Sequence, residues 1–234
     1  MKKIVISLGG SVLVPSLESN NISRYVSVLG RLAEKCRIFI VVGGGGEARR
    51  YIQVARDLGV GEAAADELGI LVTRLNARLL VAGLGDAAYP RVAEDYTEAK
   101  EFAGTGKIVV MGGITPAQTT DAVSAVLAES VDADLLINAT SVDGIYSADP
   151  KKDAAAVRYE HLTPEELLDI IKGCRMDAGA NTVLDIVAGK VVERSKIPLL
   201  VLDGREPENL YRAIAEGAYI GTTVSEEDTI PLPA

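Results

Sequence analysis

The chain has 234 residues, 48% of them hydrophobic, which is enough for one large α/β domain or two small ones around a sizeable core. Its formal net charge of −9 at pH 7 argues against a general nucleic-acid-binding protein, because such proteins gather lysine and arginine against phosphates. We find no apolar run of about 18 residues, no signal-peptide pattern and no metal-ligand spacing at Cys36 and Cys174, so we expect a cytoplasmic protein without a membrane span or zinc site.

Strands and helices are predicted to alternate along the chain. Apolar runs predict strands at Lys3–Leu8, Arg37–Val42, Lys107–Met111, Asp134–Asn138 and Pro198–Leu202. Helical spacing predicts helices at about Ile22–Lys35, Glu47–Leu58, Ala63–Ala82, Thr97–Ala103, Asp121–Ser130, Pro164–Ile171, Asn181–Arg194 and Glu206–Glu216. Because the strands are continuously apolar, both faces of the sheet should be covered. We therefore predict an α/β fold with a mainly parallel central sheet between helices, and any division into lobes near Ala133.

Glycine-rich turns follow the first three strands, as Gly9-Gly10-Ser11, Gly43 to Gly46, and Gly112-Gly113. Glycine lets a backbone approach phosphate oxygens and point its N–H groups at them, although it also permits close packing of a strand against a helix. The second turn opens into a helix with Arg49 one turn in, a typical phosphate-binding arrangement. No Walker A or GxGxxG pattern is present, so P-loop and Rossmann interpretations are poor.

Three further segments carry polar groups suited to a ligand. Asp66, Gly69, Thr73 and Asn76 share one face of a helix, which is typical either of a ligand-binding wall or of a close helix contact. The segment 114–121 follows the third glycine pair; Thr120 or Asp121 is expected to cap the next helix, and the same helix start could bind phosphate or sugar through its N–H groups and threonine hydroxyls. The loop 138–150 follows a predicted buried strand, where open α/β sheets place ligands; it is also consistent with an ordinary Asp-Gly turn.

Taken together, these motifs resemble the amino acid kinase family and, within it, the archaeal-type UMP kinase branch. The matching segments are ISLGGSVL (6–13), VVGGGGEARRY (41–51), ADELGILVTRLNA (65–77), GGITPAQTTDAVSA (112–125) and NATSVDGIYSADP (138–150). The resemblance implies a three-layer α/β sandwich formed by a single domain, 1–234. In it, about 1–132 would form an acceptor lobe and about 133–234 an ATP lobe. It also implies Mg²⁺ with ATP as co-substrate, and a homo-oligomer of six chains.

The resemblance also implies roles for individual residues. ATP would be bound by Gly9, Gly10, Ser11, Gly45, Arg49, Thr140, Tyr146 and Asp149. UMP would be bound by Gly44, Asp66, Ile114, Thr115, Pro116, Ala117, Gln118, Thr119 and Thr120. Arg49 and Asp121 would be catalytic, and Mg²⁺ would be held mainly by the ATP phosphates without dedicated protein ligands. UMP and ATP would be the partners, with no nucleic acid or membrane.

One position departs from the family pattern. Many members carry a lysine in the first strand, as in IKLGG, where it stabilises charge on the transferred phosphate; this chain has Ser7 there. We expect Arg49 to supply that positive charge, with Lys3, Lys151 and Lys152 as weaker candidates. A second motif, which carries a lysine in amino-acid-phosphorylating relatives, is replaced here by residues 175–179.

Two alternatives to a UMP kinase stay open at this stage. An isopentenyl phosphate kinase should carry two functional histidines, whereas this chain has one, His161, which we interpret as a surface or packing residue. A sensor that binds nucleotides without turnover is favoured by Ser7. The set of Arg49, Asp66 and Asp149 favours an enzyme.

Overall fold

The computed structural model describes residues 1–150, 152–153, 155–174 and 184–227. In these ranges a seven-stranded sheet has the order β3-β2-β1-β4-β6-β7-β5. The strands are β1 (Lys3–Leu8), β2 (Arg37–Val42), β3 (Val109–Met111), β4 (Leu135–Thr140), β5 (His161–Leu162), β6 (Leu199–Asp203) and β7 (Gly221–Val224). The helices are α1 (Gly10–Leu13), α2 (Ile22–Ala33), α3 (Gly45–Asp57), α4 (Glu62–Leu84), the short 3₁₀ turn η1 (Gly85–Ala87), α5 (Tyr96–Ala103), α6 (Thr120–Ser130), α7 (Pro164–Cys174), α8 (Ile186–Ser195) and α9 (Glu208–Glu216).

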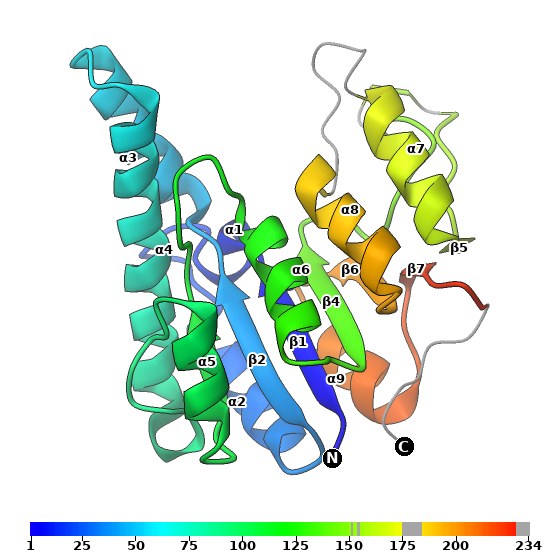
Figure 1. The fold of residues 1–234 in the computed structure, drawn as a ribbon, viewed down its shortest axis with the longest axis horizontal. Coiled ribbons are helices and arrows are strands. Elements are labelled where there is room, and N and C mark those ends of the chain that lie inside the picture. The colour runs from blue at the N-terminus through cyan, green and yellow to red at the C-terminus, as the bar shows by residue number, and fades with distance from the viewer. Residues whose placement is uncertain (151, 154, 175–183, 228–234) are drawn as a thin grey trace.

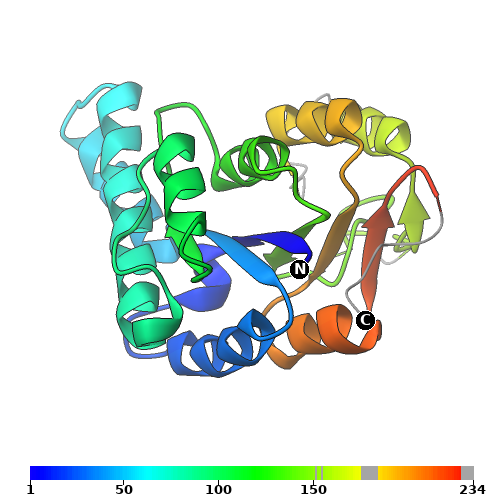
Figure 2. The same ribbon diagram turned by 60° about the horizontal axis from the view of Figure 1, so that its bottom comes forward.

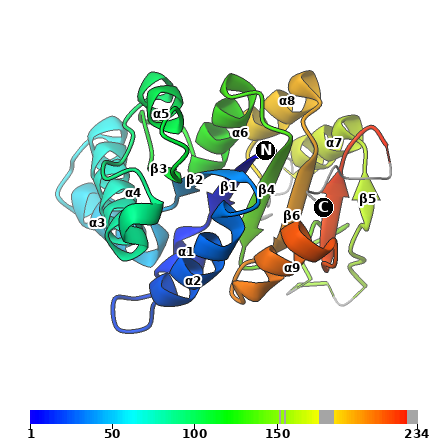
Figure 3. The ribbon, with the colours of Figure 1, turned by 90° about the horizontal axis from the view of Figure 1, so that it is seen from below.

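Helices cover both faces of this sheet, as Figures 2 and 3 show. Side chains of β1 alternate between two apolar cores: Ile4 and Ile6 join the core under α2 and α9, and Val5 joins the core under α6 and α8. All strand pairs are parallel except β6 with β7. The predicted α/β fold, a three-layer sandwich with a mainly parallel sheet, is confirmed (Figure 1).

Several predicted boundaries were wrong for local reasons. The helix predicted at Asn181–Arg194 begins at Ile186 within the described residues, because the Asp185 side chain accepts hydrogen bonds from the Val187 and Ala188 N–H groups and caps the helix there; residues 181–183 lie outside the described ranges. β5 and β7 were not predicted. β5 has two residues and β7 four, too few to show a period, and β7 is polar at its centre.

Helix α4 is the segment of the described chain that is long and apolar enough to be compared with a membrane span. By length and composition alone, Glu62–Ala87 passes that test. A core helix of a soluble protein passes the same test, and Ala77, Leu80 and Leu84 of α4 are buried in the core beside β2. The length of α4 thus fits a helix that lies along one end of the sheet, as seen in Figure 1.

The loops with the predicted ligand-binding groups meet at one edge of the sheet. β1 lies between β2 and β4, all three parallel, so their carboxyl ends are adjacent. Hydrogen bonds join the loops there, from Gly9 N to Ala139 O (3.0 Å) and from Gly43 N to Leu8 O (2.9 Å). The strands β2 and β3 follow β1 on one side of it and β4 lies on its other side, so the strand order reverses at β1, which is where open α/β sheets bind ligands.

Candidate functional site

The first two glycine turns pack directly against each other. A Cβ atom on Gly10 would lie 2.1 Å from Gly45 N and 2.5 Å from Gly43 O, and one on Gly43 would lie 2.6 Å from Gly10 N. Gly45 also has a φ of 67°, in the left-handed region that favours glycine. Close packing therefore explains why glycine is required at these positions. The same packing brings the N-termini of α1 and α3 together, where a bound anion would meet both.

The third glycine pair is pressed against α4. The N–H group of Gly113 donates to Thr73 Oγ1 (2.7 Å), and Thr73 Oγ1 donates to Ile70 O (2.6 Å). A Cβ on Gly112 would lie 2.6 Å from Thr73 Oγ1. Thr73 thus fixes the start of the β3–α6 loop, residues 112–119, against α4.

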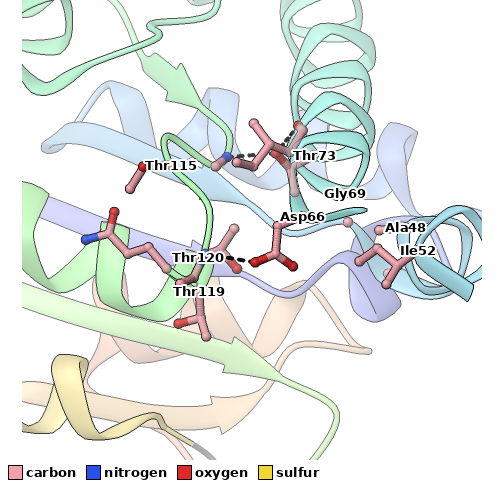
Figure 4. Close-up of a pocket in the computed structure, with 14 residues that line it drawn as sticks. Ala48, Ile52, Asp66, Gly69, Thr73, Thr115, Thr119 and Thr120 are labelled. Carbon is pink, nitrogen blue, oxygen red and sulfur yellow. Dashed lines mark hydrogen bonds between the residues drawn. The ribbon is translucent and has the colours of Figure 1, made fainter. Parts of the chain in front are cut away.

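Asp66 fixes the far end of the same loop. Its Oδ2 accepts a hydrogen bond from Ala117 N (2.8 Å), and Ala117 has a φ of 61°. Non-glycine residues rarely adopt such a conformation, and the bond to Asp66 helps to hold it. Asp66 and Thr73 therefore attach the β3–α6 loop to α4 at two points, as Figure 4 shows.

A cavity of about 440 Å³ lies between α3, α4 and this loop, and we call it the α3–α4 cavity. Asp66 and Thr73 line it from α4, Ala48 and Ile52 from α3, and Thr115, Thr119 and Thr120 from the opposite side (Figure 4). The full lining is Gly44, Gly45, Ala48, Ile52, Asp66, Gly69, Ile70, Thr73, Gly113, Thr115, Ala117, Gln118, Thr119 and Thr120. Its volume is in the range of small-molecule sites.

The lining agrees with part of the residue set predicted for UMP. Gly44, Asp66, Thr115, Ala117, Gln118, Thr119 and Thr120 lie on the cavity, whereas Ile114 and Pro116 do not line it. Gly45, expected at ATP, lines it as well. Sequence reasoning missed Ala48, Ile52 and Ile70, apolar residues that are indistinguishable from core positions by composition. Ala48 and Ile52 follow Gly45 at helical spacing, and this pattern could have indicated that they share its face of the helix.

Ser7 and Asp121 are in direct contact beside the glycine turns. Ser7 is buried, and its Oγ donates to Asp121 Oδ1 (2.8 Å) across 114 residues of sequence. Burial raises the pKa of the Asp121 carboxyl to about 6; the hydrogen bond from Ser7 opposes this, and the negative charge of Asp185 adds to it. Within the described ranges no lysine or arginine forms an ion pair with Asp121, and the Ser7 hydroxyl donates the side-chain hydrogen bond to its carboxyl group.

The loop after β4 holds the groups predicted for the adenine end of ATP. Tyr146 OH donates to Asp143 Oδ1 (2.9 Å), and Arg158 Nη1 donates to Asp143 Oδ2 (3.1 Å). The hydrogen bond to Asp143 raises the pKa of the Tyr146 phenol. Asp143 thereby fixes the Tyr146 ring, which stays partly exposed and available for stacking. Thr140 ends β4 and its carbonyl accepts from Gly204 N (2.8 Å).

Among the candidate cations, Arg49 is the best placed. It lies in the first turns of α3, is exposed, and makes no hydrogen bond or ion pair with any residue that the structure describes, although it does not line the α3–α4 cavity. Arg50 is paired with Glu47 (2.8 Å). Lys3 is excluded, because it begins β1 at the opposite end of the strand and its Nζ donates to Val131 O (2.6 Å). Lys152 Nζ lies 3.9 Å from Asp149 Oδ2. Lys151 and residues 175–179 lie outside the described residues.

The comparisons with known proteins agree with this architecture. The family model described as the amino acid kinase family matches residues 2–203. The chain belongs to the amino acid kinase family. It is 83% identical to the uridylate kinase of Methanoculleus marisnigri and 59% identical to that of Methanospirillum hungatei; the alignments cover 100% of this chain and 100% and 99% of the two relatives.

Solved structures show the same amino acid kinase architecture. The uridylate kinase of Archaeoglobus fulgidus superposes with a TM-score of 0.86 at 45% identity, over 96% of this chain and 100% of that chain. The UMP kinase of Ureaplasma parvum superposes with a TM-score of 0.81 over 96% and 99% of the two chains. Because the identity is 23%, the similarity to the second structure supports the fold alone.

Proposed function

We propose that this protein transfers the γ-phosphate of ATP to UMP and releases UDP and ADP. The observation that carries this proposal is the α3–α4 cavity, which joins a carboxylate for sugar hydroxyls, a threonine-rich loop and two glycines at the N-terminus of α3. Near-complete alignment with proteins named uridylate kinase supports the same substrate.

In this proposal the two substrates occupy opposite sides of the glycine turns. UMP lies in the α3–α4 cavity, with Asp66 on the ribose hydroxyls and the β3–α6 loop along the base and phosphate. ATP lies across the carboxyl ends of β1 and β4, with Tyr146 and Asp149 at the adenine end. The reacting phosphates then meet near Gly10 and Gly45, whose backbones are in contact.

The proposed reaction needs no general base. The second pKa of a phosphate monoester is near ~6, so UMP is largely a dianion at neutral pH and its oxygen is already nucleophilic. Catalysis then rests on alignment of the two phosphates and on neutralisation of their charge by backbone N–H groups and Arg49. This fits a chain whose one histidine, His161, lies in β5 at the far edge of the sheet.

ATP as a co-substrate implies a metal ion, and we propose Mg²⁺. Among the described residues, no group of three or more His, Cys, Asp or Glu side chains could hold a metal ion. Mg²⁺ binds readily through substrate phosphates and water with one or two carboxylates. Bound in that way, Mg²⁺ would neutralise charge on the ATP phosphates.

Acceptor selectivity tests the proposed function. We expect phosphorylation of UMP with kcat/KM at least tenfold above that of CMP, because Gln118 and the loop backbone offer hydrogen bonds that a second base leaves unpaired. A coupled ADP-release assay should compare UMP, CMP, dUMP, AMP and isopentenyl phosphate. Equal turnover of UMP and CMP would contradict the assignment of the base site. Faster turnover of isopentenyl phosphate would favour the alternative kinase.

We also propose a cytoplasmic homo-oligomer, a hexamer built from dimers, of chains that each form one domain with an acceptor lobe and an ATP lobe. The surface that supports self-association is the outer face of α4, where Leu68, Leu71, Leu75 and Leu79 are exposed at helical spacing. Monomeric proteins rarely expose such a contiguous apolar stripe. A single helix face is self-complementary about a two-fold axis, so a second copy of this chain fits it.

The expected result of Leu71→Glu combined with Leu75→Lys is a smaller particle with an unchanged circular dichroism spectrum. Leu71 and Leu75 are 59% and 61% exposed, so the fold of one chain does not depend on them. Light scattering coupled to size-exclusion chromatography measures the mass, and Val187→Glu, a 43% exposed position on α8, serves as the matched control. A wild-type monomer would contradict the proposal.

A further inference from the structure

We infer that Asn76 is a positioning residue that orients the second glycine turn toward the reacting phosphates. The inference rests on the proposed function and assigns to Asn76 a part in it. Asn76 lies on the same face of α4 as Asp66 and Thr73, but it does not line the α3–α4 cavity. Asn76 is 4% exposed, and its side chain reaches from α4 to the second glycine turn.

The Asn76 amide binds two consecutive carbonyl groups of the turn. Its Nδ2 donates to Gly43 O (3.0 Å) and to Gly44 O (3.3 Å). From helix α3 itself, Gly44 O accepts only a long hydrogen bond, donated by Ala48 N at 3.4 Å. The side chain of Asn76 therefore donates to Gly43 O and adds a second, shorter hydrogen bond to Gly44 O.

Peptide planarity converts this contact into an orientation of donors. In a trans peptide group, the C=O of one residue and the N–H of the next point in opposite directions. Holding the carbonyls of Gly43 and Gly44 toward α4 consequently points the N–H groups of Gly44 and Gly45 away from Asn76. Gly45 N lies against Gly10 of the first turn, where the reacting phosphates are proposed to meet.

The second glycine turn has no side chains of its own that could fix the orientation of its N–H groups. Four successive glycines, Gly43 to Gly46, have many accessible conformations, and Gly45 occupies the left-handed region. A turn that must present its N–H groups to an anion in one geometry needs an external restraint. Asn76 provides that restraint from a rigid helix.

The test uses Asn76→Leu, which removes both N–H donors at similar volume, and Asn76→Ser in case the first variant fails to fold. Asn209→Leu is the matched control, because Asn209 Nδ2 also donates to a backbone carbonyl, Asp203 O (3.0 Å), away from the cavity. Each variant is assayed with UMP and ATP. In parallel, UMP or inorganic phosphate is titrated while the amide NMR signals of Gly44 and Gly45 are followed.

For folded Asn76 variants we expect kcat/KM for UMP to fall at least tenfold and the phosphate-induced shifts of Gly44 and Gly45 to be lost. Asn209→Leu should leave kcat/KM and these phosphate-induced shifts unchanged, even where its change in Tm is similar to that of the Asn76 variants. A fall of less than tenfold in correctly folded protein, or a fall that the folded fraction fully explains, overturns the inference. Failure of the proposed function is distinct, because the wild-type protein itself would then show no UMP phosphorylation.

Discussion

Arg49→Ala is expected to lower kcat for UMP phosphorylation by roughly 10³-fold, the effect of removing a dedicated cation from phosphoryl transfer. Arg49 is exposed in the first turns of α3 and makes no ion pair with any described residue, so its guanidinium is available for a phosphate. No lysine is present at Ser7 to share this task. Steady-state kinetics with saturating ATP and UMP measure the effect.

Arg50→Ala is the matched control for this prediction. Arg50 is paired with Glu47 on the surface, and exposed pairs of this kind contribute about 0–1 kcal/mol to stability, so kcat should change little. Ser7→Lys should partly restore activity to Arg49→Ala, because Ser7 already contacts Asp121 and an ammonium there would face the same phosphates. Near wild-type kcat in Arg49→Ala would refute the role of Arg49 and direct attention to Lys152 and Lys151.

Asp66→Asn is expected to raise KM for UMP roughly ten- to a hundredfold while KM for ATP stays nearly unchanged. A charge-assisted hydrogen bond to a ribose hydroxyl contributes about 1.5–3 kcal/mol, and asparagine keeps the size of the side chain without the charge. The structure adds a second reason, because Asp66 also holds the Ala117 backbone of the β3–α6 loop at 2.8 Å. Initial rates at varied UMP and fixed ATP measure this change.

Glu67→Gln provides the comparison for Asp66→Asn, because Glu67 is the next residue of α4 and is exposed. It should leave both Michaelis constants unchanged. If Asp66→Asn instead raised KM for ATP and left that for UMP unaltered, the proposed places of donor and acceptor would be reversed.

Much of the fold was predictable because the strands that form its centre are uniformly apolar. The residues Lys3–Leu8 and Arg37–Val42 were predicted with the bounds that the structure has, since a strand buried on both faces has an unmistakable composition. β7 could not be predicted from an apolar pattern, because its residues Gly221–Val224 form a strand through antiparallel pairing with β6. Pairing partners distant in sequence leave no local signal.

The candidate site was predictable where a motif carries its own chemistry and obscure where it depends on packing. Asp66 and the threonines of the β3–α6 loop were predicted, and the structure places them around one cavity. The Ser7–Asp121 contact joins residues 114 positions apart, so no local pattern could indicate it. For Asn76, the sequence favoured a ligand-binding wall and a close helix contact equally. In the structure, its side chain contacts the second glycine turn.

The most direct test of the proposed reaction is to follow the γ-phosphate of ATP itself. Purified protein is incubated with γ-labelled ATP, Mg²⁺ and UMP, and the labelled products are separated by ion-exchange chromatography. The proposal predicts that the label appears in UDP in equal amount to the ADP formed, and that omission of UMP abolishes its release. Label that remains in ATP, or that appears as inorganic phosphate independently of UMP, would contradict it.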